Sequence, residues 1–579
     1  MHDLLIVGGT VVDGTGGVAR KADVAIDAGR ITAIGRTGRR ARETIDAREK
    51  IVTPGFVDIH THYDGQATWD PHLAPSCWHG VTTVVVGNCG VGFAPAAPDR
   101  HDWLIGLMEG VEDIPGAALS KGIAWGWETF PEYLDVLARM PRAIDVGTQV
   151  PHGALRAYVM GERGAANEPA TAEDIAAMSS IVRDALAAGA LGFSSSRTIG
   201  HRAVDGRPVP GTFAREDELF GIGAALAATG RGVFEVAEAG TGGRAAGDPA
   251  GSAEREMEWM AALAKSIRRP VTFLLMQNDG EPQLWRHLLA LADAASRDGA
   301  SLVPQVATRP FGMLAGHPSR VNPFAARKTY REIAALPFAE RIARLRDPDV
   351  RRRVLEERAT KGEPGTLGAL LGPAMYKRLF PLGDPLDYEP PLDASVAAVA
   401  AREGRDTEDL LYDWMLRDDG HALLFFPLLN YSEFTAEPIR EMMLHPSTVL
   451  GLGDGGAHCG IICDASMTTF VLTHWVRDRA RGPRIPLELA VRLLSRDTAA
   501  LYGLRDRGVL APGWKADLNV IDLDRIRLRP PRMEHDLPGG APRLLQRADG
   551  FDATIVSGHV VMRDGEATGA MPGALVRGG

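Results

Sequence analysis

The sequence predicts an α/β protein: a (β/α)8 barrel of the TIM type with a small β-sandwich formed by both termini. Two observations lead to this fold class. Eight apolar, strand-like segments alternate with helical segments through the middle of the chain, and short β-rich segments separated by turns occur at both ends. Barrels of this kind carry their catalytic groups at the carboxyl ends of the strands, so candidate site residues are sought there.

The composition is that of a large globular enzyme. The chain has 579 residues, of which 45% are hydrophobic and 24% charged, as is ordinary for folded proteins. The formal net charge of −10 argues against nucleic acid or an anionic membrane as a partner, and no apolar run approaches the ~20 residues that span a bilayer. The start of the chain lacks the pattern of a signal peptide, and four cysteines are too few for a disulfide scaffold. We therefore expect a cytoplasmic enzyme with a small-molecule substrate.

The two ends of the chain have the same β-rich character. N-terminal strands are expected at 4–7, 10–12, 22–26 and 30–34, with a turn at Gly8 and Gly9, and C-terminal strands at 518–522, 553–557 and 559–563. A β-unit at each end favours one sandwich formed by residues 1–54 and 506–579, with the barrel at 55–505 inserted between them. Two unrelated terminal hairpins are the alternative.

The barrel strands and helices follow in order along the middle of the chain. Strands are expected at 52–60, 82–87, 143–150, 190–194, 232–237, 271–276, 301–307 and 448–453, with helices at 172–188, 215–229, 252–267 and 283–297. A long insertion at about 309–445 precedes the last strand. Because structureless loops of this length are uncommon inside compact domains, we expect a lid or a substrate-facing subdomain there.

Two histidines at the end of the first barrel strand are the strongest sign of chemistry. Side chains alternate along a strand, so His60 and His62 project from the same face, ~7 Å apart along the backbone. Two imidazoles at this spacing can converge on one metal ion, and neutral imidazole suits zinc and its first-row neighbours. Two polar residues leaving a strand are the simpler alternative, which the matching features downstream make less favourable.

Two further residues follow strand ends that face these histidines. Cys89 comes after the second strand; a thiolate is a strong zinc ligand, although a small buried hydrophobe is an equally acceptable reading. Asp454 closes the last strand, which lies beside the first in a closed barrel. An acid there is placed to contact the metal and to take a proton from water, whereas a simple helix-capping turn is the alternative.

These residues together predict a hydrolytic metal site. His60, His62 and Asp454 would bind one divalent ion, zinc being the expected one, and leave a position open for water. Asp454 would act as general base and then protonate the leaving amine. His152, which follows the third strand, is a second catalytic candidate that could polarise a carbonyl or hold a metal ligand in place. It could equally be a loop histidine with one backbone hydrogen bond.

The motifs resemble those of the amidohydrolase superfamily, and of its N-acyl-D-amino-acid deacylase (D-aminoacylase) branch in particular. The resemblance rests on residues 54–62, 80–90, 190–195 and the Gly-Asp-Gly around Asp454, with sandwich segments at 3–13 and 508–518, so it spans nearly the whole chain. It implies a metal-dependent hydrolase of amide-like C–N bonds, with a split sandwich packed against a distorted barrel. By the same resemblance we expect a homo-oligomer.

The chain departs from the branch at its metal ligands. The histidines that the branch carries on strands five and six are missing, since 233–238 contains Glu235 instead and 273–279 contains no histidine, and strand four offers no lysine for a carbamate bridge. Three outcomes follow: one metal on His60, His62 and Asp454, with Glu235 as a candidate to complete the site; a shifted chemistry in which Cys89 does not bind metal; or a non-catalytic oligomeric scaffold. Glu235 could also be an acid ion-paired inside the barrel mouth.

The substrate is predicted only as a class. An N-acyl amino acid-like amide is favoured, and cyclic-amide or N-carbamoyl hydrolysis is the alternative within enzymes. The strand-five arginine of the branch is also missing, so Arg197, Arg202 and Arg309 are candidates to bind a substrate carboxylate. Asn430, Tyr431 and several tryptophans (Trp78, Trp103, Trp125 and Trp127) are candidates for the pocket wall, whereas Cys459 and Cys463 are expected to be buried structural thiols.

Overall fold

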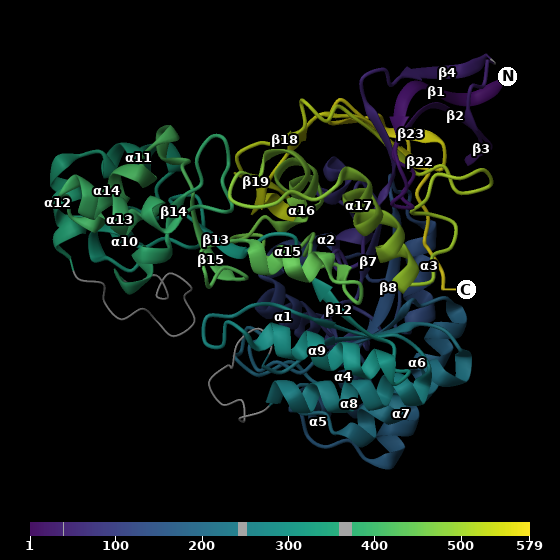
Figure 1. Ribbon diagram of the computed structural model, residues 1–579. Coiled ribbons are helices and arrows are strands. Elements are labelled where there is room, and N and C mark those ends of the chain that lie inside the picture. Colours follow the sequence, from purple (N-terminus) through teal and green to yellow (C-terminus); the bar gives the residue numbers. More distant parts are fainter. Residues whose placement is uncertain (39, 241–251, 358–372, 579) are drawn as a thin grey trace.

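An eight-stranded parallel sheet, curled into a barrel, forms the centre of the molecule (Figure 1). The structure is a computed structural model that describes residues 1–38, 40–240, 252–357 and 373–578. Within these residues the barrel strands are β6 (Phe56–Asp58), β7 (Val81–Val86), β8 (Asp145–Pro151), β9 (Gly192–Ser196), β10 (Val233–Ala237), β11 (Val271–Leu274), β12 (Leu302–Val306) and β16 (Val449–Leu450). The predicted fold class is confirmed.

The barrel is closed at the carboxyl ends of its first and last strands. The β6 and β16 strands are short, and the chain just beyond them pairs instead: the N–H of Asp454 donates to the carbonyl of His60 (3.0 Å), and that of His62 donates to the carbonyl of Gly455 (2.8 Å). Thr61 and Gly455 form a parallel bridge between these bonds. Most of the predicted last strand, 448–453, is therefore irregular. The chain at its carboxyl end is held by backbone bonds of His60, His62 and Asp454, which are the predicted metal ligands.

Helices cover the outside of the barrel, as the alternating pattern predicts. Four of them, α6 (Ala172–Ala188), α7 (Glu216–Thr229), α8 (Ser252–Ile267) and α9 (Leu284–Arg297), lie side by side along one flank. The α6 helix begins where predicted because Thr171 and Asp174 form a reciprocal capping box. The bounds of α6 and α8 match those expected from the sequence.

Both termini build one nine-stranded sheet at one end of the molecule (Figure 1). Its strands are β1 (His2–Val11), β2 (Arg20–Asp27), β3 (Arg30–Gly35), β4 (Ala41–Asp46), β5 (Ile51–Pro54), β17 (Leu518–Ile521), β22 (Phe551–Val556), β23 (His559–Arg563) and β24 (Glu566–Ala567). The two ends of the chain join where β5 pairs antiparallel with β17. They enclose a hydrophobic core of their own, in agreement with the predicted sandwich. The exact boundaries at 54/55 and 505/506 stay a prediction.

Two local predictions were wrong in this region. Gly8 and Gly9 do not form a turn; β1 continues through them with an irregular register between Ile6 and Gly9. The expected strand 52–60 is split, because β5 belongs to the terminal sheet and β6 to the barrel. The break lies at Gly55, where an added Cβ would come within 2.2 Å of the Thr82 hydroxyl. A glycine is needed there for the chain to pass between the two sheets.

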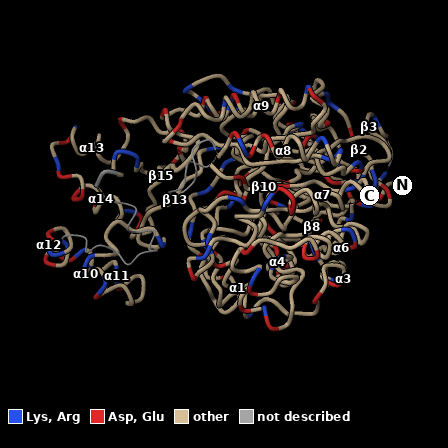
Figure 2. Tube along the Cα trace, turned by 90° about the horizontal axis from the view of Figure 1, so that it is seen from below, with Lys and Arg blue, Asp and Glu red and all other residues tan. Residues whose placement is uncertain are grey.

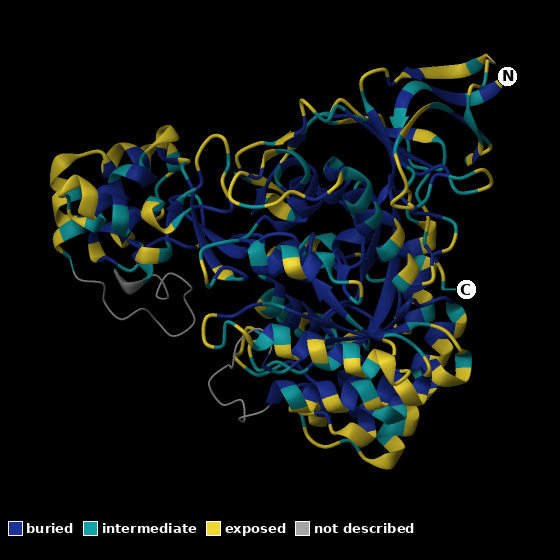
Figure 3. Ribbon diagram, in the orientation of Figure 1, coloured by how far each residue is buried: buried dark blue, intermediate teal, exposed yellow. Residues whose placement is uncertain are grey.

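The insertion forms a ribbon and a helical body. The ribbon pairs β13 (Phe311–Ala315), β14 (Phe380–Pro381) and β15 (Leu424–Leu429) in an antiparallel sheet. The helical body contains α10 (Lys328–Ile333), α11 (Phe338–Leu345), α12 (Pro348–Glu356), α13 (Val396–Glu403) and α14 (Thr407–Met415). Figure 3 shows that this body has a buried interior and an exposed outer surface, and it stands to one side of the barrel. Residues 358–372 of the predicted insertion lie outside the described residues.

Charge is spread over the whole trace. Figure 2 shows acidic and basic residues intermingled on the barrel, on the terminal sheet and on the helical body. Among the described residues, no helix is both long and apolar enough to cross a bilayer.

Candidate metal centre

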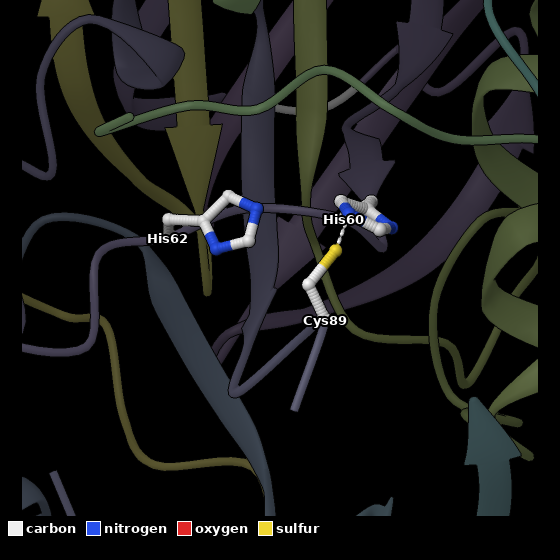
Figure 4. Close-up of side chains that lie close together, drawn as sticks. All are labelled: His60, His62 and Cys89. Atoms are coloured by element: carbon white, nitrogen blue, oxygen red, sulfur yellow. Dashed lines mark hydrogen bonds between the residues drawn. The ribbon is translucent and has the colours of Figure 1, made fainter. Parts of the chain in front are cut away.

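His60 and His62 lie just beyond β6, at the carboxyl end of the barrel (Figure 4). Both are buried, at 1% and 2% exposure, and their rings stand edge to face with centroids 5.4 Å apart. The bonds that close the barrel, from Asp454 N–H to His60 and from His62 N–H to Gly455, hold both backbones. The two imidazoles are therefore presented by a rigid part of the fold.

Cys89 meets the histidines from the next strand, three residues after β7 ends. Its Sγ lies 3.3 Å from Nε2 of His60, the contact marked in Figure 4. The residue adopts a positive φ of 54°, and its N–H donates to Oε2 of Glu235 (3.0 Å). A left-handed backbone at a non-glycine residue is unfavourable unless the surroundings impose it, and such residues gather at functional sites. His60, His62 and Cys89 form a group whose candidate ligand atoms all lie within 4.8 Å of one another.

Asp454 approaches the same histidines from the end of the last strand. Its Oδ1 lies 3.6 Å from Nε2 of His60 and 3.7 Å from Nε2 of His62. The segment around it is unusual, because Leu452, Asp454 and His458 all have positive φ. The conformation turns the Asp454 carboxylate into the barrel mouth, toward both imidazoles.

Three separations between these donors fit a divalent metal ion. Ligand atoms ~2.0–2.3 Å from a zinc ion at tetrahedral angles lie about 3.3–3.7 Å from one another. The separations of His60 Nε2 from Cys89 Sγ and from Asp454 Oδ1, and of His62 Nε2 from Asp454 Oδ1, all fall in this range. Imidazole, carboxylate and thiolate are the donor types that zinc takes in proteins.

The outer nitrogens of the two histidines are set by different neighbours. Nδ1 of His60 lies 3.1 Å from Oε1 of Gln305, an atom that can only accept, so His60 carries its proton at Nδ1 and keeps Nε2 for a ligand. Nδ1 of His62 instead faces Oε1 of Glu112 at 3.4 Å. Both histidines therefore point Nε2 toward the proposed ion.

Burial and these neighbours also give His60, His62 and Asp454 very different pKa values. Burial lowers the pKa of His60 to about 4. Burial would also lower the pKa of His62, but the carboxylates of Glu112 and Asp454 raise it to about 9. Burial alone would raise the pKa of Asp454, but His62 and His60 bring it down to about 2. Asp454 is thus a carboxylate at neutral pH.

Glu235 lies beneath the site, on β10. It is fully buried, and its Oε1 has no hydrogen-bond partner among the described residues. Burial raises its pKa to about 8. A buried carboxyl oxygen without a partner is the kind of group that a cation would satisfy, while the other oxygen holds the Cys89 backbone.

His152 is placed away from this group. It begins α4 (His152–Met160), and both of its ring nitrogens are engaged, Nδ1 with the Ser195 hydroxyl (2.8 Å) and Nε2 with Oε1 of Glu218 (2.9 Å). It is 0% exposed and is not part of the cavity wall. The predicted role of His152 in polarising a carbonyl stays a prediction.

A cavity of about 490 Å³ opens over the site. Its wall combines the candidate ligands and other polar groups with a similar number of apolar side chains. The polar and charged side chains are His60, His62, Cys89, Glu112, Thr198, His201, Glu238, Asp454 and His458, and the apolar side chains are Ala237, Leu274, Met276, Phe311, Leu428, Leu429, Leu452 and Ile462. Phe311, Leu428 and Leu429 come from the ribbon, so the base of the insertion faces the cavity. Its role as a lid or substrate-facing subdomain stays a prediction.

Sequence reasoning missed Glu112, His201 and His458. His458 lies four residues after Asp454, inside a segment already singled out, so its position gave a usable signal. His201 follows β9, and its Nδ1 lies 2.9 Å from the Ser196 hydroxyl. Burial lowers the pKa of His201 to about 4, so it is neutral at ordinary pH. Glu112 ends the helix α1 (His101–Glu112), where no motif marks it.

The other pocket candidates are engaged elsewhere. Arg197 pairs with Glu256, Arg202 donates to the carbonyl of Gly206, and buried Arg309 pairs with Asp464. Asn430, Tyr431 and the four tryptophans are likewise not among the residues of the cavity wall. Among the described residues, the wall contains no lysine or arginine. Cys459 and Cys463 are buried, unpaired thiols, as expected.

The barrel fold and the group of donors at its mouth suit a metal-dependent hydrolase, the class to which comparison with known proteins also points. The chain belongs to the amidohydrolase family, whose model matches residues 43–562. This membership confirms the predicted class, a metal-dependent hydrolase of amide or related C–N bonds.

Two relatives and one solved structure illustrate the likeness. A D-aminoacylase of Alcaligenes xylosoxydans xylosoxydans is 38% identical over 194 residues, 33% of this chain and 37% of that protein. An N-acyl-D-aspartate deacylase of the same organism is 27% identical over 580 residues, 100% of this chain and 95% of that protein. The crystal structure of N-acyl-D-glutamate deacylase from Bordetella bronchiseptica, complexed with zinc and a phosphonate inhibitor, has a TM-score of 0.64 at 23% identity and covers 100% of this chain and 99% of that one. The last likeness shows the shared fold.

Proposed function

We propose that this enzyme hydrolyses the amide bond of N-acyl amino acids, with one divalent cation held by His60, His62 and Asp454. The observation that carries the proposal is the convergence of two imidazole Nε2 atoms on one carboxylate oxygen, at 3.6 and 3.7 Å, in the wall of a cavity. The named relatives are deacylases, which favours this reaction over the cyclic-amide alternative.

The donor set favours zinc and a single ion. Cys89 supplies a soft donor 3.3 Å from His60 Nε2, and Glu235 supports it through the Cys89 backbone. When bound, the ion would supply Lewis acidity that polarises the scissile carbonyl and makes water a better nucleophile. The absence of histidines from β10 and β11 supports a count of one ion.

Asp454 is the residue that moves the proton. Its low pKa keeps it ionised at neutral pH, so it can accept a proton from the attacking water. The same carboxyl then gives the proton to the leaving amine, which completes the hydrolysis to an acid and an amine. His458 Nε2 lies 3.9 Å from Asp454 Oδ2, on the cavity side.

The apolar part of the wall selects the substrate. Phe311, Leu428 and Leu429 from the insertion, together with Leu274 at the end of β11 and Met276 just beyond it, favour an apolar acyl group or amino acid side chain. On the polar side, His201 is a neutral imidazole that can hydrogen-bond a polar group of the substrate.

A panel of N-acetyl-D-amino acids and their L enantiomers tests the proposal. Amine release should require zinc, should be lost after chelation and should return on adding the metal. Release of no amine from any member by the zinc-loaded enzyme would contradict the proposal. We further propose a homo-oligomer in solution, which a monomeric mass by light scattering would exclude.

A further inference from the structure

Glu112 reaches the metal centre from outside the barrel strands. It is the last residue of α1, in the segment that joins β7 to β8, and only 2% of it is exposed. Its Oε1 lies 3.4 Å from Nδ1 of His62, and its Oε2 lies 3.9 Å from Nε2 of His458. One carboxylate thus faces two imidazoles of the cavity wall, one through each oxygen.

Glu112 contacts Nδ1 of His62, the ring nitrogen that would not bind the metal. Nε2 of His62 faces Asp454, whereas Nδ1 faces Glu112 and has no hydrogen-bond partner among the described residues. The separation of 3.4 Å is that of an ion pair. Metal-binding histidines commonly direct their second N–H to a carboxylate, which fixes the ring orientation and raises its basicity. Glu112 is placed to do this for His62.

The backbone around Glu112 fixes the carboxylate in place. The Glu112 carbonyl accepts the N–H of His458, and Asp113 accepts the N–H of Gly460 (3.0 Å) through its side chain. Asp113 also pairs with Arg320 of the insertion. The end of α1 is therefore tied to the loop that carries Asp454 and to the insertion, and it cannot move away without breaking both contacts.

Burial makes a purely structural role for this carboxyl unfavourable. A buried acid is costly unless charged or polar groups compensate it. The groups that face Glu112 are the imidazoles of His62 and His458, while Asp454, which also lies nearby, is acidic. The groups that stabilise the buried Glu112 carboxyl are therefore the two imidazoles of the cavity wall.

We propose that Glu112 is a positioning residue, which holds the His62 ring with Nε2 toward the cation and holds His458 at the cavity wall beside Asp454. The inference rests on the proposed function, because it takes His62 as a ligand. It adds a residue of α1 to a site otherwise built from strand ends.

Zinc affinity tests the role without relying on turnover. Metal-free protein is titrated with zinc in competition with a chromophoric chelator, for the unaltered chain, for Glu112→Gln and for Glu109→Gln. Glu109 is the matched control, since it lies on the same helix but outside the cavity wall. We expect Glu112→Gln to bind zinc about 10- to 100-fold more weakly and Glu109→Gln to bind it as the unaltered protein does. The kcat at saturating zinc should also fall in Glu112→Gln alone.

The outcomes separate this inference from the proposed function. Unchanged zinc affinity in a folded Glu112→Gln protein overturns the inference and leaves the function standing. An unaltered chain that binds no zinc overturns both. Should circular dichroism show that Glu112→Gln is unfolded, Glu112→Asp replaces it: this variant keeps the charge but withdraws it by one methylene, so weaker zinc binding supports the inference and unchanged binding overturns it.

Discussion

Asp454 and His60 are joined twice, once through the backbone and once through the site. The Asp454 N–H donates to the His60 carbonyl (3.0 Å), which closes the barrel, and Asp454 Oδ1 lies 3.6 Å from His60 Nε2. The structural seam between the first and last strands is therefore also where the metal donors meet. Changes at these residues should affect metal binding and turnover before they affect the fold.

Replacing the proposed proton carrier should abolish most of the activity. Asp454→Asn keeps the size of the side chain and the backbone bond to His60 but removes the base and a charged ligand. We expect kcat to fall by about 100- to 10,000-fold, the range that a general acid–base contributes. The measurement is amine release from an N-acetyl-D-amino acid at saturating zinc. Asp102→Asn, an exposed change on α1, is the control and should leave kcat unaltered.

The absorption spectrum of the cobalt(II)-substituted protein tests whether Cys89 is a metal ligand. Burial and the negative charge of Glu235 hold the pKa of the Cys89 thiol well above its usual value, so only a bound cation would ionise it. Cobalt(II)-substituted protein should therefore show a thiolate-to-cobalt charge-transfer band that disappears in Cys89→Ala and persists in Cys77→Ala. If the unaltered protein lacks this band, Cys89 is not a ligand.

The cavity wall predicts a preference among N-acyl amino acids. Its apolar side chains, and the acids Glu112 and Glu238, should disfavour a second carboxylate on the substrate. We expect kcat/KM for N-acetyl-D-leucine to exceed that for N-acetyl-D-aspartate by about tenfold or more, because a charged group left unpaired in a buried site is costly. An equal or reversed ratio would show that a cation outside the described wall binds the acidic side chain.

The buried carboxylate of Glu389 should stabilise the packing of the insertion against the barrel, and this stabilisation should depend on pH. Burial alone would raise the pKa of Glu389, but His474, Arg479 and the Ala436 N–H hold it well below its usual range. The stabilisation is therefore complete above the ordinary pKa of ~4.3 and is lost as the pH falls toward the lower folded-state pKa. Glu389→Gln should cost about 3–5 kcal/mol at neutral pH.

Thermal unfolding between pH 7 and pH 3 checks this assignment. The difference in Tm between the unaltered protein and Glu389→Gln should be constant at neutral pH and should shrink as the medium becomes acidic. Glu403→Gln, an exposed change at the end of α13, should follow the unaltered protein throughout. A difference that grows toward acid would mean that the folded-state pKa of Glu389 is raised, contrary to its contacts.

Much of the fold could be predicted because the periodic pattern is local. The bounds of α6 and α8 follow from apolar spacing and, for α6, from its capping box, and the strand ends that carry His60, Cys89 and Asp454 follow from short motifs. The split at Gly55 could not be read from an unbroken apolar run, because it depends on which sheet each half joins.

The site was only partly predictable, for a similar reason. Glu112 reaches His62 across 50 positions of sequence, and its position depends on how the end of α1 meets the loop after β16. His152 also follows a strand, but its ring contacts Ser195 and Glu218 and is not part of the cavity wall. Strand ends identify candidate residues, whereas side-chain direction and long-range packing decide which of them meet.

The most direct test of the account is the metal content of the purified protein, measured by elemental analysis before and after loading with zinc, beside a His60→Ala, His62→Ala double variant. We predict one ion per chain in the loaded protein and none retained by the variant. A chain that takes up no ion on loading, or a double variant that retains it, would contradict the proposed centre.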